Sequence, residues 1–338
     1  PVHQLNWVYL HFLHNFNNMT SINSLISDLE LDKSLIDCLK NRDLDQKFFY
    51  TEEGADLYYG SYDHSAKSVP VDFSSPEYYD LITKELKKKQ RIALVSLGCG
   101  DASSEKPLLK ELKKDGYNFT YFAVDASRQM LDLAVNNLVN LGVDAQYLCA
   151  DIMGKDFREE IIQLTADFDC RAFLFLGNTI SNVNQTNIVD SLYSMLKKND
   201  LLFLDLRIRR SLDNSEDLEL FNFYSQYLED PKKIKWLLRP LRSVGIDPSC
   251  GVLNLEMLKE KSVGAILLNF FFLFNKKVII KARNEVIHCL PEERLDLLNI
   301  RAYYPDTLNI FFKEHGFRLV QSKIDQNIRH GFFIYQKV

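Results

Sequence analysis

Two glycines that follow an apolar run are the strongest chemical signal in the sequence. Gly98 and Gly100 flank Cys99 directly after Val95-Ser96-Leu97, and a helical pattern follows them. Glycine suits such a turn because a Cβ would hold the backbone away from a ligand and would penalise a positive φ. Dinucleotide-binding turns share this arrangement, but Ser103 replaces the third glycine of their G-x-G-x-x-G pattern. The turn therefore favours S-adenosylmethionine (SAM), whose methionine part has no pyrophosphate to place at the helix end.

Acidic side chains end the next two apolar runs. Asp125 comes 25 residues after Gly100, and its carboxylate can accept hydrogen bonds from both ribose hydroxyls. The alternative is that Asp125 only caps the helix that follows. Asp151 is predicted to accept a hydrogen bond from the adenine amine while Ile152 packs on the ring, and the alternative there is an acid in an ordinary turn.

Small polar side chains follow a further apolar run, in Gly177-Asn178-Thr179-Ile180-Ser181-Asn182. The carboxyl ends of parallel strands share one edge of a sheet, where ligands bind. We expect Asn178 at the cofactor and Asn182 at the substrate. The alternative is a polar turn that only caps the next helix.

The elements that must position these residues follow an alternating pattern from residue 91 onward. Apolar runs alternate with helical patterns, which is typical of a mostly parallel sheet covered on both faces. We predict five strands, at residues 92–98, 120–125, 145–150, 172–177 and 201–206. The helices between and after them are predicted at residues 105–115, 128–141, 156–165 and 185–197. A helix at 305–315 and strands at 317–324 and 331–338 then close the sheet with an antiparallel hairpin. This ending is expected of a class I SAM-methyltransferase Rossmann-like fold, an α/β doubly wound sheet.

The remaining segments are predicted to build on that sheet. Apolar positions at helical spacing predict helices at 22–41 and 76–89. After residue 207 a helical stretch at 211–240 leads to a long hairpin of 264–274 and 277–290. The expected organisation is a helical N-terminal layer that contributes to the site (1–90), a SAM-binding domain (91–207 and 305–338), and an α+β insertion that binds substrate (208–304).

Composition excludes some partners. The net charge of −5 gives no broad attraction to phosphate backbones, which makes nucleic acid an unlikely substrate. The longest apolar run, Val263–Phe274, is too short to cross a bilayer, so no membrane span is predicted. Six cysteines without a C-x-x-C pair favour a reducing, cytoplasmic setting. We interpret the first 18 residues as a loosely attached leader, with Met19 or Pro1 as the start, and the sequence leaves the oligomeric state open.

Several of these motifs together resemble one family. The matching pieces are Lys47-Phe48-Phe49-Tyr50 with Gly54-Ala55-Asp56-Leu57-Tyr58, then Leu97–Gly100, Val124–Ser127, Cys149–Asp151 and Leu176–Asn182. The combination resembles the histidine-specific Nα-methyltransferases of ergothioneine biosynthesis and their relatives, which include fungal enzymes that methylate a tryptophan-derived α-amine. The resemblance covers about residues 45 to 206. It implies that Tyr50, Gly98, Asp125 and Asp151 contact SAM, that Lys106 stands near the SAM carboxylate, and that Asn182 holds the substrate amino acid.

The sequence departs from that family at two places. Its Tyr-Tyr-Pro-Thr-Arg segment is absent, and Ser61-Tyr62-Asp63-His64-Ser65 occupies the region. The family's Glu-x-Ser pair, which binds the histidine imidazole, would fall at residues 298–300, where no acid stands. The resemblance therefore does not carry histidine over as the substrate.

Methyl transfer from a sulfonium needs positioning more than acid–base groups, because the sulfonium already carries the activation. An amine acceptor must arrive neutral, with one carbonyl or carboxylate oxygen orienting its lone pair. Asn182 and Tyr303 are the candidate catalytic residues, and Tyr58, Tyr59 and Tyr304 are further candidates for the substrate wall. Half-buried packing is the alternative for each tyrosine.

The sequence thus predicts a SAM-dependent methyltransferase without a metal, acting on a small-molecule acceptor, with the amine of an amino acid or related metabolite as the candidate. The number of methyl groups transferred stays open. A second hypothesis is a catalytically inactive SAM-binding protein that acts through protein partners, with the apolar residues Leu268, Phe270, Phe272 and Phe274 as its adhesive face. A nicotinamide oxidoreductase is disfavoured by Ser103 and the terminal hairpin.

Overall fold

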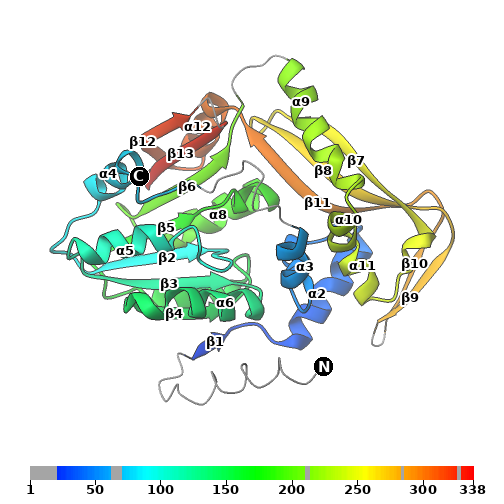
Figure 1. The fold of residues 1–338 in the computed structure, drawn as a ribbon, viewed down its shortest axis with the longest axis horizontal. Coiled ribbons are helices and arrows are strands. Elements are labelled where there is room, and N and C mark those ends of the chain that lie inside the picture. Colours follow the sequence, from blue (N-terminus) through cyan, green and yellow to red (C-terminus); the bar gives the residue numbers. More distant parts are fainter. Residues whose placement is uncertain (1–20, 62–70, 210–213, 283–284, 326–328) are drawn as a thin grey trace, which may run out of the picture.

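A large, mostly parallel sheet forms the centre of the molecule (Figure 1). The structure is a computed structural model that describes residues 21–61, 71–209, 214–282, 285–325 and 329–338. The strand order is β1-β4-β3-β2-β5-β6-β13-β12. Strands β1 to β6 pair in parallel, whereas β13 lies antiparallel between β6 and β12. This confirms the class I SAM-methyltransferase fold with its antiparallel terminal hairpin. The strands are β1 (Ile22–Ser24), β2 (Ile92–Leu97), β3 (Phe119–Asp125), β4 (Asp144–Cys149), β5 (Cys170–Phe175), β6 (Leu201–Arg207), β12 (Phe317–Asp325) and β13 (His330–Lys337).

Helices cover both faces of this sheet, as the predicted alternation requires. One face packs on α4 (Pro76–Glu85), α5 (Lys106–Lys114) and α6 (Arg128–Leu138). The other packs on α7 (Lys155–Leu164), α8 (Gln185–Met195) and α12 (Pro305–Glu314). Because the central strand β2 is buried along its whole length, its sequence is nearly all apolar.

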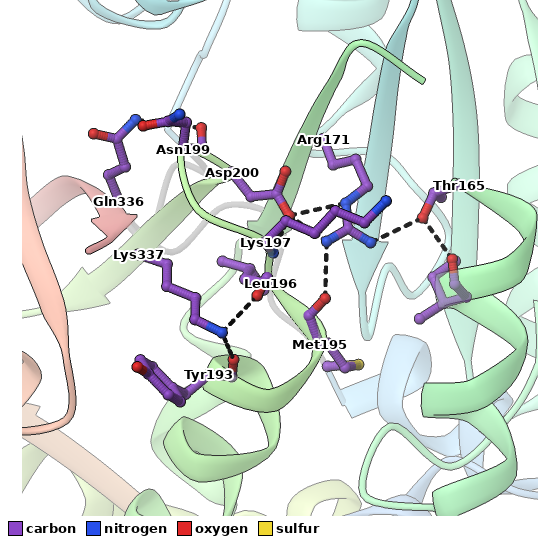
Figure 2. A network of polar contacts seen from close by, with 11 residues as sticks. Thr165, Arg171, Tyr193, Met195, Leu196, Lys197, Asn199, Asp200, Gln336 and Lys337 are labelled. Carbon is purple, nitrogen blue, oxygen red and sulfur yellow. Dashed lines mark hydrogen bonds and ion pairs between the residues drawn. The ribbon is translucent and has the colours of Figure 1, made fainter. Parts of the chain in front are cut away.

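A buried ion pair stabilises the end of the sheet opposite the glycine turn (Figure 2). Arg171, on β5, is 1% exposed and pairs with Asp200. Its guanidinium also donates to the Thr165 hydroxyl at 3.2 Å and to the Met195 carbonyl, in the last turn of α8, at 2.8 Å. The carbonyls at a helix end lack partners within the helix, so a cation there satisfies and stabilises them. The pair therefore fixes α8 to the sheet.

A second, three-stranded sheet of order β11-β8-β7 stands beside the first (Figure 1). Its strands are β7 (Gly251–Glu260), β8 (Ala265–Phe274) and β11 (Arg294–Tyr303), and β9 (Val278–Ala282) pairs only with β10 (Glu285–Cys289). The predicted pairing of 264–274 with 277–290 is therefore wrong. An apolar run indicates a strand but not its partner, and the 277–290 stretch folds back on itself instead.

One face of β8 forms a separate core with the helices of the insertion. Leu268, Phe270, Phe272 and Phe274 are each at most 1% exposed. They share this core with residues of α9 (Asn214–Ser225), α10 (Pro231–Leu237) and α11 (Arg239–Ser243). The apolar stripe that the partner-binding hypothesis requires is thus buried rather than exposed.

Three elements of the segment predicted as an N-terminal layer (1–90) lie between the two sheets (Figure 1), namely α2 (Asp28–Asn41), the 3-10 helix η1 (Gln46–Phe49) and α3 (Gly54–Ser61). The predicted helix at 22–41 begins too early, because Ile22–Ser24 forms β1, in parallel with β4. Ser27 starts α2 through a capping box with Glu30.

No helix in the described ranges is long and apolar enough to cross a bilayer. All six cysteines are free thiols, and the candidate start Met19 lies outside the described residues.

Candidate cofactor and acceptor site

The glycine turn after β2 adopts the conformation that its sequence predicts. Gly98 and Gly100 have φ of 68° and 55°, and the Gly98 N–H donates to the Val124 carbonyl of β3 at 2.8 Å. A Cβ on Gly100 would meet no atom within 4 Å, so this side of the turn is open to a ligand. A Cβ on Gly98 would lie 2.7 Å from the Thr179 methyl carbon. Gly98 therefore also lets the turn after β2 pack closely on the turn after β5.

Asp125 sits at the end of β3 and is held by the same turn. One carboxylate oxygen accepts the Gly100 N–H and the other the Ser127 N–H, both at 2.9 Å. Burial raises the pKa of Asp125, against the lowering effect of these N–H groups. The side chain that caps α6 is Ser127, which accepts the Met130 N–H, so Asp125 is not the cap. Each carboxylate oxygen has a second lone pair, which leaves capacity for a ribose diol.

Asp151, after β4, is paired with a lysine from η1. Its carboxylate lies 2.5 Å from the Lys47 ammonium and also accepts the Met153 N–H at 2.9 Å. Burial is the largest single influence and lowers the pKa of Lys47, but Asp151 and Asp45 together raise it above its usual value. An adenine amine would share Asp151 with Lys47, a partner that the sequence does not reveal. Ile152 is half-buried against the main core.

A cavity of about 170 Å³ opens between the N-terminal layer, the turn after β5 and the insertion. It is smaller than typical ligand pockets of roughly 300–1,000 Å³, which suits a small metabolite. Its walls are mostly aromatic and amide side chains, namely Gln46, Tyr50, Tyr58, Ser61, Asn178, Asn182, Phe223, Tyr224, Tyr227, Lys233, Trp236, Leu298 and Ile300. A larger and more open acidic groove on α2, of about 450 Å³, includes none of the predicted site residues.

The insertion holds η1 against this cavity. The Trp236 indole N–H donates to the Phe49 carbonyl at 3.0 Å, and the Arg239 guanidinium donates to the Phe48 carbonyl at 2.8 Å. The Tyr50 ring lies against Trp236, with ring centroids 5.8 Å apart. Both carbonyls at the end of η1 are therefore satisfied by α10 and α11.

Tyr50 joins the cofactor side to the cavity. Its carbonyl accepts a hydrogen bond from the hydroxyl of Ser127, which follows Asp125 by two residues, at 2.7 Å. Its side chain lines the cavity beside Tyr58, with ring centroids 5.1 Å apart. Burial raises the pKa of Tyr50 to about 12, so its phenol remains protonated. The predicted cofactor residue thus stands at the border of both sites.

The two asparagines of the turn after β5 line the cavity in different roles. Asn178 has a φ of 62°, accepts the Arg207 N–H at 3.0 Å and donates to the Ser181 hydroxyl at 2.8 Å. The Asn178 side chain therefore holds the turn after β5 to the end of β6. The Asn182 amide oxygen accepts only the Ser181 hydroxyl among the described residues, at 2.9 Å, and retains a lone pair for a ligand.

Tyr303 does not lie in the site. It is 0% exposed, belongs to the main core, and donates its hydroxyl to the Gln185 side-chain oxygen at 2.8 Å. Burial raises its pKa well above the usual range. The prediction that it contacts the substrate is therefore corrected, because the last residue of β11 points into the sheet core.

Three other candidates also lie outside the cavity wall. Tyr304 precedes α12, with the Arg209 guanidinium 5.7 Å from its ring centre. Tyr59 has its pKa raised, first by burial and then by Asp101 beside the glycine turn. Lys106 is exposed at the first position of α5, and its role at the SAM carboxylate stays a prediction. Of the segment Ser61–Ser65, which stands where the family's Tyr-Tyr-Pro-Thr-Arg motif would lie, only Ser61 is within the described ranges, and it lines the cavity.

Sequence reasoning missed most of the insertion's contribution to the wall. Phe223, Tyr224 and Tyr227 come from α9 and the turn after it, and Lys233 and Trp236 come from α10. The only available signal was the density of aromatic residues in a helical stretch with polar neighbours, which fits packing equally well.

The chain was compared with curated protein sequences and with solved structures. No curated protein sequence matches the chain significantly. Among solved structures, a SAM-dependent methyltransferase from Clostridium acetobutylicum shares 12% identity over 84% of this chain and 98% of its own, with a TM-score of 0.44. A 1,6-didemethyltoxoflavin-N1-methyltransferase from Burkholderia thailandensis, with bound 1,6-didemethyltoxoflavin and S-adenosylhomocysteine, shares 10% identity over 93% of this chain and 92% of its own, with a TM-score of 0.40.

One family model matches residues 31–206, which is just over half of the chain. Its description is a histidine-specific, SAM-dependent methyltransferase. The matched range contains the glycine turn, Asp125, Asp151 and the turn that ends at Asn182. The chain belongs to this family of SAM-dependent methyltransferases.

Proposed function

We propose that this SAM-dependent methyltransferase methylates the amine of a small metabolite, an amino acid or a close relative, whose side chain is apolar or aromatic. The observation that carries the proposal is the composition of the cavity wall, which is aromatic and amide-rich and lies beside the cofactor turn. We further propose that residues 208–304 act as the acceptor-binding part and residues 1–90 as a layer shared by both sites.

The residues present fit the cofactor. Gly100 leaves open space beside the turn, and Asp125 retains acceptor capacity for a ribose diol. Asp151 supplies a carboxylate for the adenine amine. SAM supplies a methyl group already activated on a sulfonium, so the protein's task is to position the acceptor.

The cavity favours a neutral amine with an apolar side chain. Leu298 and Ile300 line it at the position where the family resemblance would place an acid. An imidazole there would lose hydrogen bonds that it makes to water, which is unfavourable without a polar partner. Asn182 offers an amide oxygen that can accept an amine N–H and so orient the nitrogen lone pair. No acid or histidine lines the described wall, so the amine has to arrive deprotonated.

Calorimetric titration tests the cofactor part of the proposal. The full chain is titrated with SAM, S-adenosylhomocysteine and NADH, alongside Asp125→Ala. Asp144→Ala is the matched control, because Asp144 begins β4 at the other end of the sheet, where it accepts the Thr120 hydroxyl at 2.6 Å. We expect micromolar affinity for the SAM pair that is lost in Asp125→Ala and kept in Asp144→Ala. Binding of NADH but not of SAM by the folded protein would refute the assignment.

A methyl-transfer screen tests the acceptor part. Labelled SAM is incubated with the 20 common amino acids and with the corresponding amines, and products are identified by mass. We expect acceptors with aromatic or aliphatic side chains to be preferred over histidine. Preference for histidine, or for hydroxyl acceptors over amines, would contradict the proposal.

A further inference from the structure

We propose that Lys233 forms an anion subsite in the acceptor cavity and binds a carboxylate of the acceptor. This inference rests on the proposed function, since it assigns a second recognition group to the same cavity. Of the residues that the structure places around the cavity, Lys233 alone carries a formal charge. The remaining wall is aromatic, aliphatic or neutral polar, so the cavity's own charge is positive.

The ammonium of Lys233 is held at the wall by an aromatic ring. It lies 3.9 Å from the centre of the Tyr227 ring, a cation–π distance. Tyr227 is itself packed, with its ring stacked on Phe270 at 5.8 Å and beside Tyr224 at 5.3 Å. Phe270 is completely buried. The ring that contacts the Lys233 ammonium is thus anchored in the insertion's core.

Glu229, four residues before Lys233, is exposed, and no ion pair joins the two within the described ranges. Two other acids of this region have partners elsewhere. Asp230, which precedes α10, accepts the Lys232 N–H at 2.8 Å as the helix cap. Glu52, on the segment after η1, pairs with Arg239. Within the described ranges no ion pair is recorded for Lys233, which is half-buried. A partly buried cation without a protein counterion is stabilised by an anion from a ligand.

The same charge selects against acceptors that carry an amine alone. A like charge nearby disfavours the protonated form of an amine, and a purely cationic acceptor is repelled by Lys233. An acceptor with a carboxylate instead neutralises Lys233, and its amine is left for the amide side chains that also line the cavity. The subsite therefore favours amino acids over their decarboxylated amines.

The test uses Trp236 as the reporter, because it lines the cavity. Trp7→Phe removes the other tryptophan of the sequence. With the full chain saturated by S-adenosylhomocysteine, the Trp236 emission is titrated with 3-phenylpropionate and with phenethylamine, which share a phenyl ring and differ in charge. Lys233→Met and Lys233→Glu are compared with Lys232→Met and Lys235→Met, which remove exposed lysines from the same helix.

We expect the parent protein to bind 3-phenylpropionate at least about tenfold more tightly than phenethylamine. Lys233→Met should abolish this preference, Lys233→Glu should reverse it, and both control variants should keep it. An unchanged preference in Lys233→Met, or equal loss in the control variants, overturns the subsite even if amines are methylated. Conversely, a Lys233-dependent preference for the acid without methylation of any amine keeps the subsite and refutes the proposed function.

Discussion

The close contact between the turn after β2 and the turn after β5 makes Gly98 the most informative position for substitution. A Cβ at residue 98 would lie 2.7 Å from the methyl carbon of Thr179 and would occur at a φ of 68°. The left-handed conformation costs a non-glycine residue roughly 1–2 kcal/mol. Overpacking by one methyl group adds about 1–3 kcal/mol. We therefore expect Gly98→Ala to lower the free energy of unfolding by about 2–5 kcal/mol.

The two contributions can be separated. Thr179→Ser removes the clashing methyl but keeps the hydroxyl that donates to the Leu176 carbonyl at 2.9 Å. In the double variant Gly98→Ala/Thr179→Ser, we expect the free energy of unfolding to recover by the overpacking contribution, about 1–3 kcal/mol. The contribution from the left-handed backbone should remain lost. Gly100→Ala is the matched control for the backbone share, since its φ is 55° and its Cβ would meet no atom within 4 Å.

Urea unfolding of the four variants measures these free energies, and calorimetry with S-adenosylhomocysteine shows whether the turns keep their shape. If Thr179→Ser restores none of the stability lost in Gly98→Ala, the contact between the turns is not what demands glycine at residue 98. A Gly100→Ala variant as unstable as Gly98→Ala would refute the reasoning as well.

Three further predictions concern buried polar groups. Arg171→Met leaves Asp200 as a buried, unpaired acid and should cost about 3–5 kcal/mol in urea unfolding, with unchanged affinity for SAM. Burial raises the pKa of Glu105 to about 7 from 4.5, so its folded state binds the proton more tightly. Stability should consequently fall as pH rises from 4.5 to 7, by up to about 3 kcal/mol at about 1.4 kcal/mol per pH unit, and this fall should be absent from Glu105→Gln. Tyr303→Phe leaves Gln185 without its donor and should lose about 1–3 kcal/mol of stability, while kcat/KM stays unchanged if Tyr303 is a core residue.

The central sheet was predictable because each of its signals is local. The run that forms β3 is apolar along its length and ends in an acid, so both the strand and the position of Asp125 follow from neighbouring residues. The three-residue strand β1 is too short to show an alternating pattern and was absorbed into the helix that follows it. The partners of β8 could not be predicted either. Local periodicity indicates that a segment is a strand, but it does not indicate that this strand pairs with β7 and β11.

The residues proposed to contact the cofactor were likewise easier to locate in the sequence than the residues of the cavity wall. Asp151 ends a strand and can be found by that position, but its pairing with Lys47 joins residues 104 positions apart. Tyr303 was misassigned because an aromatic side chain in a strand serves a core and a ligand wall equally well. Its burial depends on the packing of β11 beside β6, where Ile208 forms a bridge with Tyr303.

The residues proposed to contact the cofactor lie within the family match, whereas much of the cavity wall lies in the insertion. The match ends at residue 206 and includes every residue assigned here to SAM. The wall residues within the match are Gln46, Tyr50, Tyr58, Ser61, Asn178 and Asn182. The remaining wall, with Trp236, Lys233 and Ile300, comes from residues beyond 206. On the proposed function, the residues that position the methyl group therefore lie within the family match, and most of the residues that select the acceptor lie in the insertion.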